Sequence, residues 1–121
     1  MIFFLKHVCL IQMSMSNNDK QIVADITKRI LLGESFGDIF VNMYDDINYL
    51  RILIGKFHAD PNEEDRNGHL ALYYAINRNY YDIVKYLLDH GANPNLKSTY
   101  GCIAFRFVHT KQMEDILKQY D

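Results

Sequence analysis

The stretch DRNGHLALYYAINRNYYDIVKYLLDHGANPNL, residues 65–96, decides the fold of this 121-residue chain, because its pattern begins again 33 residues further on. Identical residues recur at this spacing without a gap. The pairs are Gly68 and Gly101, Ala71 and Ala104, Asp82 and Asp115, Ile83 and Ile116, and Lys85 and Lys118. Self-similarity with a period of about 33 residues is typical of solenoids built from helix pairs. We therefore predict an all-α helical solenoid.

Each half of this stretch has the pattern of one helix. Apolar residues at helical spacing predict a short helix over 70–77 and a longer one over 81–90. Gly91 follows the second helix, where a residue with positive φ commonly ends a helix, and Asn79 is expected to do the same between the two. Pro94 keeps the following segment extended. One repeat is thus a helix pair followed by a loop.

The units on either side are less regular. The segment HADPN at 58–62 matches GANPN at 91–95, which indicates a degenerate repeat before the clear one. After Gly101, helices are expected over 103–109 and 113–120. The last helix lacks the usual final turn, so we expect the C-terminal side to be poorly capped.

These units define a single predicted domain over residues 17–121. Its parts are a capping helix at 17–33, a degenerate repeat at 34–63, the clear repeat at 64–96 and a truncated repeat at 97–121. The polar face of the N-terminal helix fits the need of a solenoid for a polar end. Residues 1–16 are predicted to be a flexible or non-native tail, since translation could also start at Met13 or Met15.

The clear repeat resembles the ankyrin repeat family, and the resemblance covers roughly residues 34–121. The family pattern G-x-T-P-L-H-x-A-A, V-x-x-L-L and G-A-D-x-N is similar to GHLALYYAI, VKYLL and GANPN in this chain. Leu70, Ala71 and Tyr73 replace the usual Thr, Pro and His. Because a helix-opening Pro and a hydroxyl cap each contribute up to about 1 kcal/mol, these repeats should be less stable than consensus ones.

Composition excludes several classes of protein. The net charge of −2 and the scattered Lys and Arg residues are wrong for a nucleic-acid binder, which needs a dense basic stripe. Cys9 and Cys102 form no disulfide framework, so we expect a reducing compartment: the cytoplasm, of the producing cell or of a host cell. The opening MIFFLKHVCLI is too short to cross a bilayer.

The resemblance implies the site, because in this family the loop tips and the inner face of the short helices meet the partner protein. The positions that match are Glu64, Arg66, Asn67, His69, Asn77 and Arg78 in the clear repeat, and Lys97, Thr99, Tyr100, Cys102, Thr110 and Lys111 in the next. Tyr and Arg most often anchor interfaces, so Tyr100, Arg66 and Arg78 are the expected anchors. The competing interpretation is that these are solvated loop residues. The other tyrosines are expected in the core or at its rim.

The predicted function is a non-catalytic module that binds another protein, as a monomer or with weak self-association and without a cofactor. An alternative use is an inhibitor or immunity-type protein that blocks one enzyme. A more remote alternative is an enzyme or metal-binding protein, for which His69 and Cys102 occupy equivalent positions in adjacent repeats. Two such ligands are a weak signal beside C-x-x-C pairs, and no Gly-rich phosphate loop is present, since GESFG at 33–37 is expected to be a turn.

Overall fold

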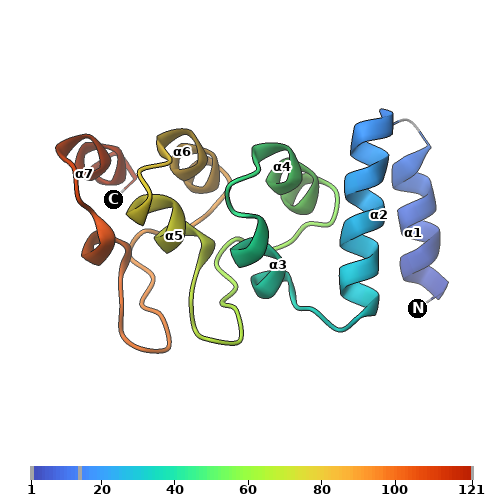
Figure 1. Ribbon diagram of the computed structural model, residues 1–121, viewed down its shortest axis with the longest axis horizontal. Helices are drawn as coiled ribbons and strands as arrows, with labels where there is room; N and C mark the ends of the chain where they lie inside the picture. Colours follow the sequence, from blue (N-terminus) through green and yellow to red (C-terminus); the bar gives the residue numbers. More distant parts are fainter. Residues whose placement is uncertain (1, 14, 121) are drawn as a thin grey trace.

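The computed structural model describes residues 2–13 and 15–120, and these form a row of helix pairs (Figure 1). In chain order the helices are α1 (Ile2–Gln12), α2 (Asn17–Leu31), α3 (Phe36–Met43), α4 (Ile47–Gly55), α5 (Ala71–Asn77), α6 (Tyr81–Asp89), the 3-10 helix η1 (Ala104–Phe107) and α7 (Lys111–Lys118). Helices α4, α6 and α7 form one layer, and α3, α5 and η1 form the other. Helices α1 and α2 stand side by side at one end. The predicted all-α solenoid is confirmed.

Local sequence fixes where these helices begin. The Asp46 carboxylate accepts hydrogen bonds from the backbone N–H groups of Asn48 and Tyr49, both at 3.1 Å, and so caps α4 as its sequence suggests. The first turn of α2 is capped by Ser16, whose hydroxyl accepts from the N–H of Asp19 at 3.2 Å. Asn17, the first residue of the predicted capping helix, is also the first residue of α2.

Residues with positive φ end the helices and turns as predicted. Gly91 has φ of +100° directly after α6, and Asn79 has φ of +59° between α5 and α6. His58, which is equivalent to Gly91 one period earlier, adopts φ of +57° at the start of the HADPN loop. A side chain on Gly91 would meet open space, so the need for glycine there comes from the backbone conformation alone.

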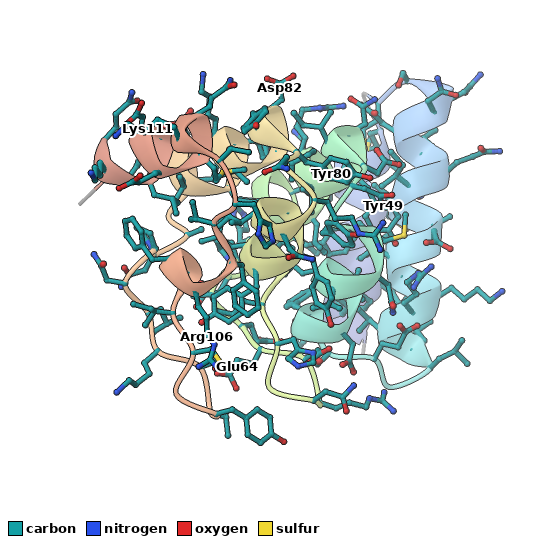
Figure 2. All side chains as sticks on the ribbon, turned by 60° about the vertical axis from the view of Figure 1, so that its left-hand side comes forward. Tyr49, Glu64, Tyr80, Asp82, Arg106 and Lys111 are labelled. Carbon is teal, nitrogen blue, oxygen red and sulfur yellow. The ribbon has the colours of Figure 1, made fainter. Side chains whose placement is uncertain are left out.

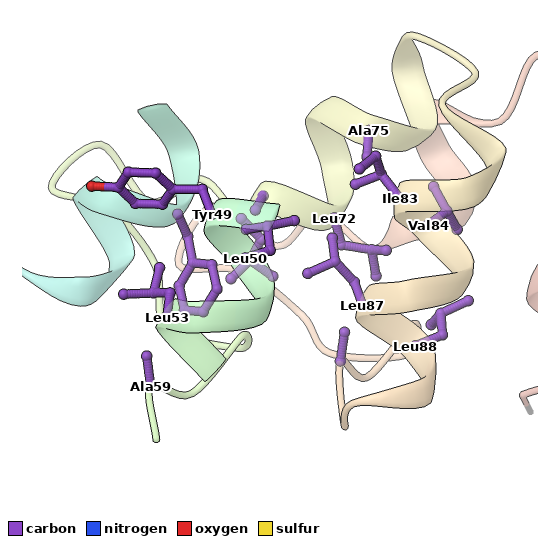
Figure 3. Close-up of a cluster of buried hydrophobic side chains, with 14 of the residues drawn as sticks. Tyr49, Leu50, Leu53, Ala59, Leu72, Ala75, Ile83, Val84, Leu87 and Leu88 are labelled. Atoms are coloured by element: carbon purple, nitrogen blue, oxygen red, sulfur yellow. The ribbon is translucent and has the colours of Figure 1, made fainter. Parts of the chain in front are cut away.

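One continuous core runs through all helix pairs. Figure 3 shows Leu50 of α4 pointing towards Leu72 of α5 and Leu87 of α6, and these three side chains are almost completely buried. The same core reaches Leu117 of α7 at one end and Ile26 of α2 at the other. Because each pair covers the apolar face of its neighbour, the stability of each unit depends on the adjoining one.

The N-terminal segment differs from the expectation. Residues 1–16 were predicted to be a flexible or non-native tail, but α1 occupies most of this range, and Val8 is buried against the core with Phe4 packed beside it. The apolar run is long enough for three turns, and the partly apolar face of α2 offers a surface on which it can pack. The predicted capping role requires α2 to be the outermost helix of the array. In the structure α1 packs on its outer side instead.

The C-terminal unit also differs. A helix was expected over 103–109, but η1 spans only Ala104–Phe107, and Val108 is already extended with φ of −74° and ψ of 129°. The sequence is rich in aromatic and β-branched residues, which are poor helix formers, and Thr110 must be extended to cap α7. The expectation of poor capping was wrong for α7, because Met113, Ile116 and Leu117 are buried and its remaining residues are polar.

The segment GESFG is more than a turn. Ser35 caps α3 and Gly37 lies in the first turn of that helix, where its N–H donates to the carboxylate of Glu63 at 2.6 Å. A Cβ atom on Gly37 would lie 2.0 Å from the carbonyl oxygen of Glu64. Glycine is therefore required at this position by the close approach of the next loop.

Candidate functional site

The two loop tips that follow α4 and α6 have the same construction. In the first, the N–H of Asp65 donates to the carbonyl of His69 at 2.9 Å, and Gly68 has φ of +77°. In the second, the N–H of Ser98 donates to the carbonyl of Cys102 at 2.8 Å, and Gly101 has φ of +79°. The 33-residue period is thus visible in backbone geometry as well as in sequence.

Several of the predicted tip residues hold one tip against the next. The Glu64 carboxylate accepts a hydrogen bond from the N–H of Thr99 at 2.7 Å and another from its hydroxyl. Arg66 makes the equivalent contacts one unit earlier, where its N–H and guanidinium donate to Asp38 at 3.0 and 3.1 Å. The backbone N–H of Arg66, helped by its guanidinium, holds the pKa of Asp38 below its usual range. These residues shape the tips and are only partly available to a partner.

A shallow cleft lies on the inner face, between α5 and η1. It has a volume of about 210 Å³ and is lined by His69, Tyr73, Tyr74, Asn77 and Phe107. The rings of Tyr73 and Phe107 stack with their centroids 4.9 Å apart. Together they give the cleft an aromatic floor between polar side chains.

Hydrogen bonds fix the walls of this cleft. The buried Tyr73 hydroxyl donates to the carbonyl of Cys102 at 2.6 Å and also lies 3.0 Å from the carbonyl of Leu96, and burial raises the Tyr73 pKa. His69 Nδ1 and the Tyr74 hydroxyl are 2.8 Å apart. His109 Nε2 lies 2.7 Å from the Asn77 side-chain oxygen. The cleft is therefore preorganised by contacts that cross from one repeat to the next.

A row of tyrosines continues this surface towards α3. The Tyr74 ring stacks on Tyr44, which ends α3, with centroids 5.5 Å apart, and Tyr44 in turn lies 6.2 Å from Tyr80. Tyr80 is 38% exposed. Figure 2 shows Tyr80 between Asp82 of α6 and Glu64, and nearer to Asp82. The inner face thus carries a band of aromatic rings from α3 to η1.

The structure brings only part of the predicted set together. His69 and Asn77 line the cleft, while Asn67, Arg78 and Lys97 are exposed and do not belong to its lining. Tyr100 is 71% exposed at the second tip, and its ring covers Gly68, where a Cβ would lie 2.8 Å from the Tyr100 Cε2 atom. Cys102 is half-buried, and its N–H is bound by the Ser98 hydroxyl.

Thr110 and Lys111 lie away from the tips. Thr110 caps α7, and Lys111 is in the first turn of that helix, 3.4 Å from Asp115. In Figure 2, Lys111 is at the opposite side of the molecule from Glu64. The first helix of this unit is only one 3-10 turn, so the chain leaves the inner face earlier than in the clear repeat. The role of the twelve residues in binding stays a prediction.

Sequence reasoning missed the aromatic residues of the inner face, although a signal for them was present. Tyr74 lies three residues before Asn77 on a short helix, so the two share one face. The 33-residue period then assigns Phe107 to the position of Tyr74, and Tyr44 to the position of Asn77. Applying the period to the inner face would have identified the row.

Other kinds of site find no support in the described residues 2–13 and 15–120. Within these ranges no three His, Cys, Asp or Glu side chains are grouped so that they could bind a metal ion. None of the helices in the same ranges has the length and apolar character needed to span a bilayer.

Comparison with known proteins supports the resemblance seen in the sequence. The family model for ankyrin repeats, in three copies, matches residues 10–98. Ankyrin repeat protein FPV222 of fowlpox virus is 48% identical over 40 residues, which are 33% of this chain and 5% of that protein. An ankyrin repeat-containing protein of Treponema pallidum is 44% identical over 46 residues, which are 38% of this chain and 15% of that protein.

A longer but weaker match is to BCL-6 corepressor-like protein 1 of Homo sapiens, with 29% identity over 94 residues, which are 75% of this chain and 5% of that protein. The chain therefore spans only a small part of the length of each of these relatives. No solved structure gives a significant match.

Proposed function

Because this chain belongs to the ankyrin repeat family, whose repeats generally serve as protein–protein interaction modules, we propose that it is a non-catalytic module that binds another protein. Repeats of this kind present an extended concave surface made by the successive units. The partner would contact the loop tips and the inner face of α3, α5 and η1. The free thiols Cys9 and Cys102 support a cytoplasmic location for the module.

The observation that carries this proposal is the preorganised aromatic cleft on the inner face. Its volume of about 210 Å³ suits one apolar side chain of a partner, whereas pockets for small-molecule substrates span roughly 300–1,000 Å³. Tyrosine is enriched in interfaces because it combines a large apolar ring with a polar end. The cleft, the tyrosine row and the exposed Tyr100 make one surface with the composition of a protein-binding site.

The test compares partner capture by the wild-type chain and by two surface variants. In the first variant Arg78→Glu is combined with Tyr100→Ala, both at exposed positions of the inner face and tip. The matched control is Lys85→Glu on the outer helix α6. Captured proteins are quantified by mass spectrometry, and the affinity of a recombinant candidate is then measured by calorimetry.

We expect one protein to be retained by wild type and by the control, and to bind the inner-face variant at least about tenfold more weakly, a loss of roughly 1.4 kcal/mol. Circular dichroism must show that all three chains are folded. Equal binding by both variants would place the contact elsewhere and contradict the proposed surface. Loss of binding in the control alone would assign it to the outer helices.

A further inference from the structure

One end of the solenoid exposes a concentrated set of apolar side chains. Ten large apolar side chains are exposed among the residues that the structure describes, and six of them belong to α1, α2 and their flanking residues. The six are Phe3 (87% exposed), Leu5 (43%), Leu10 (67%), Met13 (80%), Leu31 (49%) and Leu32 (71%). Scattered exposed apolar residues are normal, but a contiguous group marks a surface that is covered in the working state of a protein.

The residues of α1 form one face. An apolar groove of about 530 Å³ on its outer side is lined by Leu5, Lys6, Cys9, Leu10 and Met13. A second groove of about 460 Å³, between α1 and α2, includes Leu31 and Leu32. We name the four exposed apolar side chains of α1 and its flank, Phe3, Leu5, Leu10 and Met13, together with Lys6 and Cys9, the α1 face. It lies at the outer end of the row of helices (Figure 1).

The size of the α1 face is that of half a stable interface. Taking about 200 Å² for each whole large apolar side chain, the exposed fractions of Phe3, Leu5, Leu10 and Met13 leave roughly 550 Å² of apolar surface, to which Cys9 and the Lys6 stem add. If two copies covered each other, they would bury roughly twice this area. Specific stable interfaces bury about 1,200–2,000 Å² in total. One further copy of the chain therefore matches what the face needs.

We propose that the α1 face is the interface of a two-fold symmetric dimer, in which α1 of one copy packs against α1 of the other. A two-fold axis places the same patch on both sides, so an apolar face of uniform character complements itself. Homodimer interfaces are more apolar than those of transient complexes, as this face is. The Lys6 stem can lie along the apolar surface while its ammonium group stays at the rim.

The charges of α1 favour a second copy over a lipid surface. Lys6 and His7 are its two basic residues, and the whole chain has a net charge of −2. Helices that lie on membranes usually carry several Lys or Arg residues, each of which attracts anionic lipids. A dimer needs no such charges. It leaves the loop tips and the aromatic cleft, which belong to the repeats beyond α2, free for a partner.

Sedimentation velocity between about 1 and 100 µM tests the dimer. We expect the wild-type chain to be dimeric at the upper end of this range, and Leu10→Glu to weaken association by about 100-fold or more, because one leucine is lost from each copy. The matched control is Ile47→Glu, at a position that is 40% exposed in the first turn of α4, where a carboxylate suits the helix. It should dimerise as wild type does.

Cys9 provides a second test that does not depend on a destabilising change. A two-fold axis near the middle of α1 leaves each Cys9 only about 3 Å along the helix from the axis, given a rise of 1.5 Å per residue. A short thiol–thiol cross-linker should therefore join two copies of Cys102→Ser, and it should not join two copies of Cys9→Ser. Cys9 and Cys102 are the two cysteines of the chain, and both are free thiols.

Each contrary result overturns the proposal. A wild-type chain that stays monomeric at 100 µM has its α1 face covered by something else. If that monomer also pellets with anionic vesicles, and Leu10→Glu does not, the face is a lipid-docking surface. A dimer that survives Leu10→Glu, or that cross-links through Cys102 and not through Cys9, uses a different interface.

Discussion

The two ends of the solenoid differ in the character of their outermost helices. At the C-terminal end, α7 buries Met113, Ile116 and Leu117, and its remaining side chains are polar. At the N-terminal end, α1 buries Val8 and exposes Phe3 and Leu10 among other apolar side chains. The first end is closed towards water in the way that repeat arrays require, and the second is not.

This difference follows from the amino-acid order in the two helices. The sequence KQMEDILK of α7 places its apolar residues at i, i+3 and i+4, so that they form one stripe. The sequence IFFLKHVCLIQ of α1 is apolar around most of its circumference. A helix of this kind needs cover on more than one side, and α2 supplies only one. The polar outer side of α7 can face water without a further contact. The apolar outer side of α1 implies contact with another molecule.

The largest expected effect comes from truncating the buried residue of the closed end. Met113 is completely buried, so Met113→Ala should lower the free energy of unfolding by about 3 kcal/mol through lost burial and a cavity. Val8→Ala at the open end should lower it by only about 1 kcal/mol, because Val8 packs at the edge of the core.

Urea unfolding followed by circular dichroism measures both values. The protein concentration must be the same for each variant, because dimerisation would add to the apparent stability. Gln112→Ala, at an exposed position of α7, is the control and should change little. If Met113→Ala and Val8→Ala lowered the free energy of unfolding equally, α1 and α7 would contribute equally to the core. The proposed difference between the two ends would then be wrong.

The sequence predicted the middle of this molecule better than its two ends. The 33-residue period located α5 and α6 to within about one residue, because Gly91, Asn79 and the apolar spacing all indicate the same helix ends. It could not predict η1, whose equivalents in the clear repeat form a full helix. Ala104 is followed by aromatic and β-branched residues, which have a low helical propensity. A comparison of positions 33 residues apart matches the residues of the two units but does not take this propensity into account.

The candidate site was predicted in outline and missed in detail for a similar reason. His69 and Asn77, two of the predicted residues, line the cleft, but Tyr73 and Tyr74 were expected in the core or at its rim and Phe107 was not in the predicted set. A tyrosine can be buried by its ring and still contribute to a surface with its edge, as Tyr74 does beside His69. Glu64 joins the tips through a contact across 35 residues and Arg66 through one across 28 residues, and no local sequence pattern reveals such contacts.

Helix caps at the two ends offer a smaller test of the same contrast. The Thr110 hydroxyl caps α7 through the N–H of Met113 at 3.2 Å and also lies 3.2 Å from the Tyr81 hydroxyl of the preceding unit. Ser16 caps α2 with one exposed hydrogen bond. We expect Thr110→Ala to lower the free energy of unfolding by about 1.5 kcal/mol and Ser16→Ala by about 0.5 kcal/mol.

Chemical denaturation gives both differences, and Thr110→Ser should recover most of the loss because it keeps the hydroxyl. If Thr110→Ala and Ser16→Ala have the same effect, the contact between Thr110 and Tyr81 adds nothing to the cap. The closed end would then be held by its buried side chains alone.

An effect smaller than that of Thr110→Ala concerns the link that joins the open end to the repeats, and it should depend on pH. The Tyr49 hydroxyl of α4 donates to the Asp25 carboxylate of α2 at 2.6 Å, and Arg29 contacts the same carboxylate at 2.9 Å. The hydrogen bond from Tyr49 and, after it, Arg29 hold the Asp25 pKa below its ordinary value of 3.8, against the opposing effect of burial. Because Asp25 is 43% exposed, we expect Tyr49→Phe to destabilise the chain by only about 1 kcal/mol at pH 7.

A lowered carboxyl pKa in the folded state stabilises the protein above the unfolded value, near 3.8, and this contribution disappears as the pH falls through the folded pKa. The difference in unfolding free energy between wild type and Tyr49→Phe should therefore be constant from pH 7 to about 5 and narrow as the pH falls below 4. Tyr73→Phe is the matched control, since the Tyr73 hydroxyl binds backbone carbonyls that do not titrate. Its effect should be the same across this range. If the Tyr49→Phe difference does not narrow in acid while α2 remains folded, the effect of the Tyr49 hydroxyl does not depend on the ionised Asp25 carboxylate.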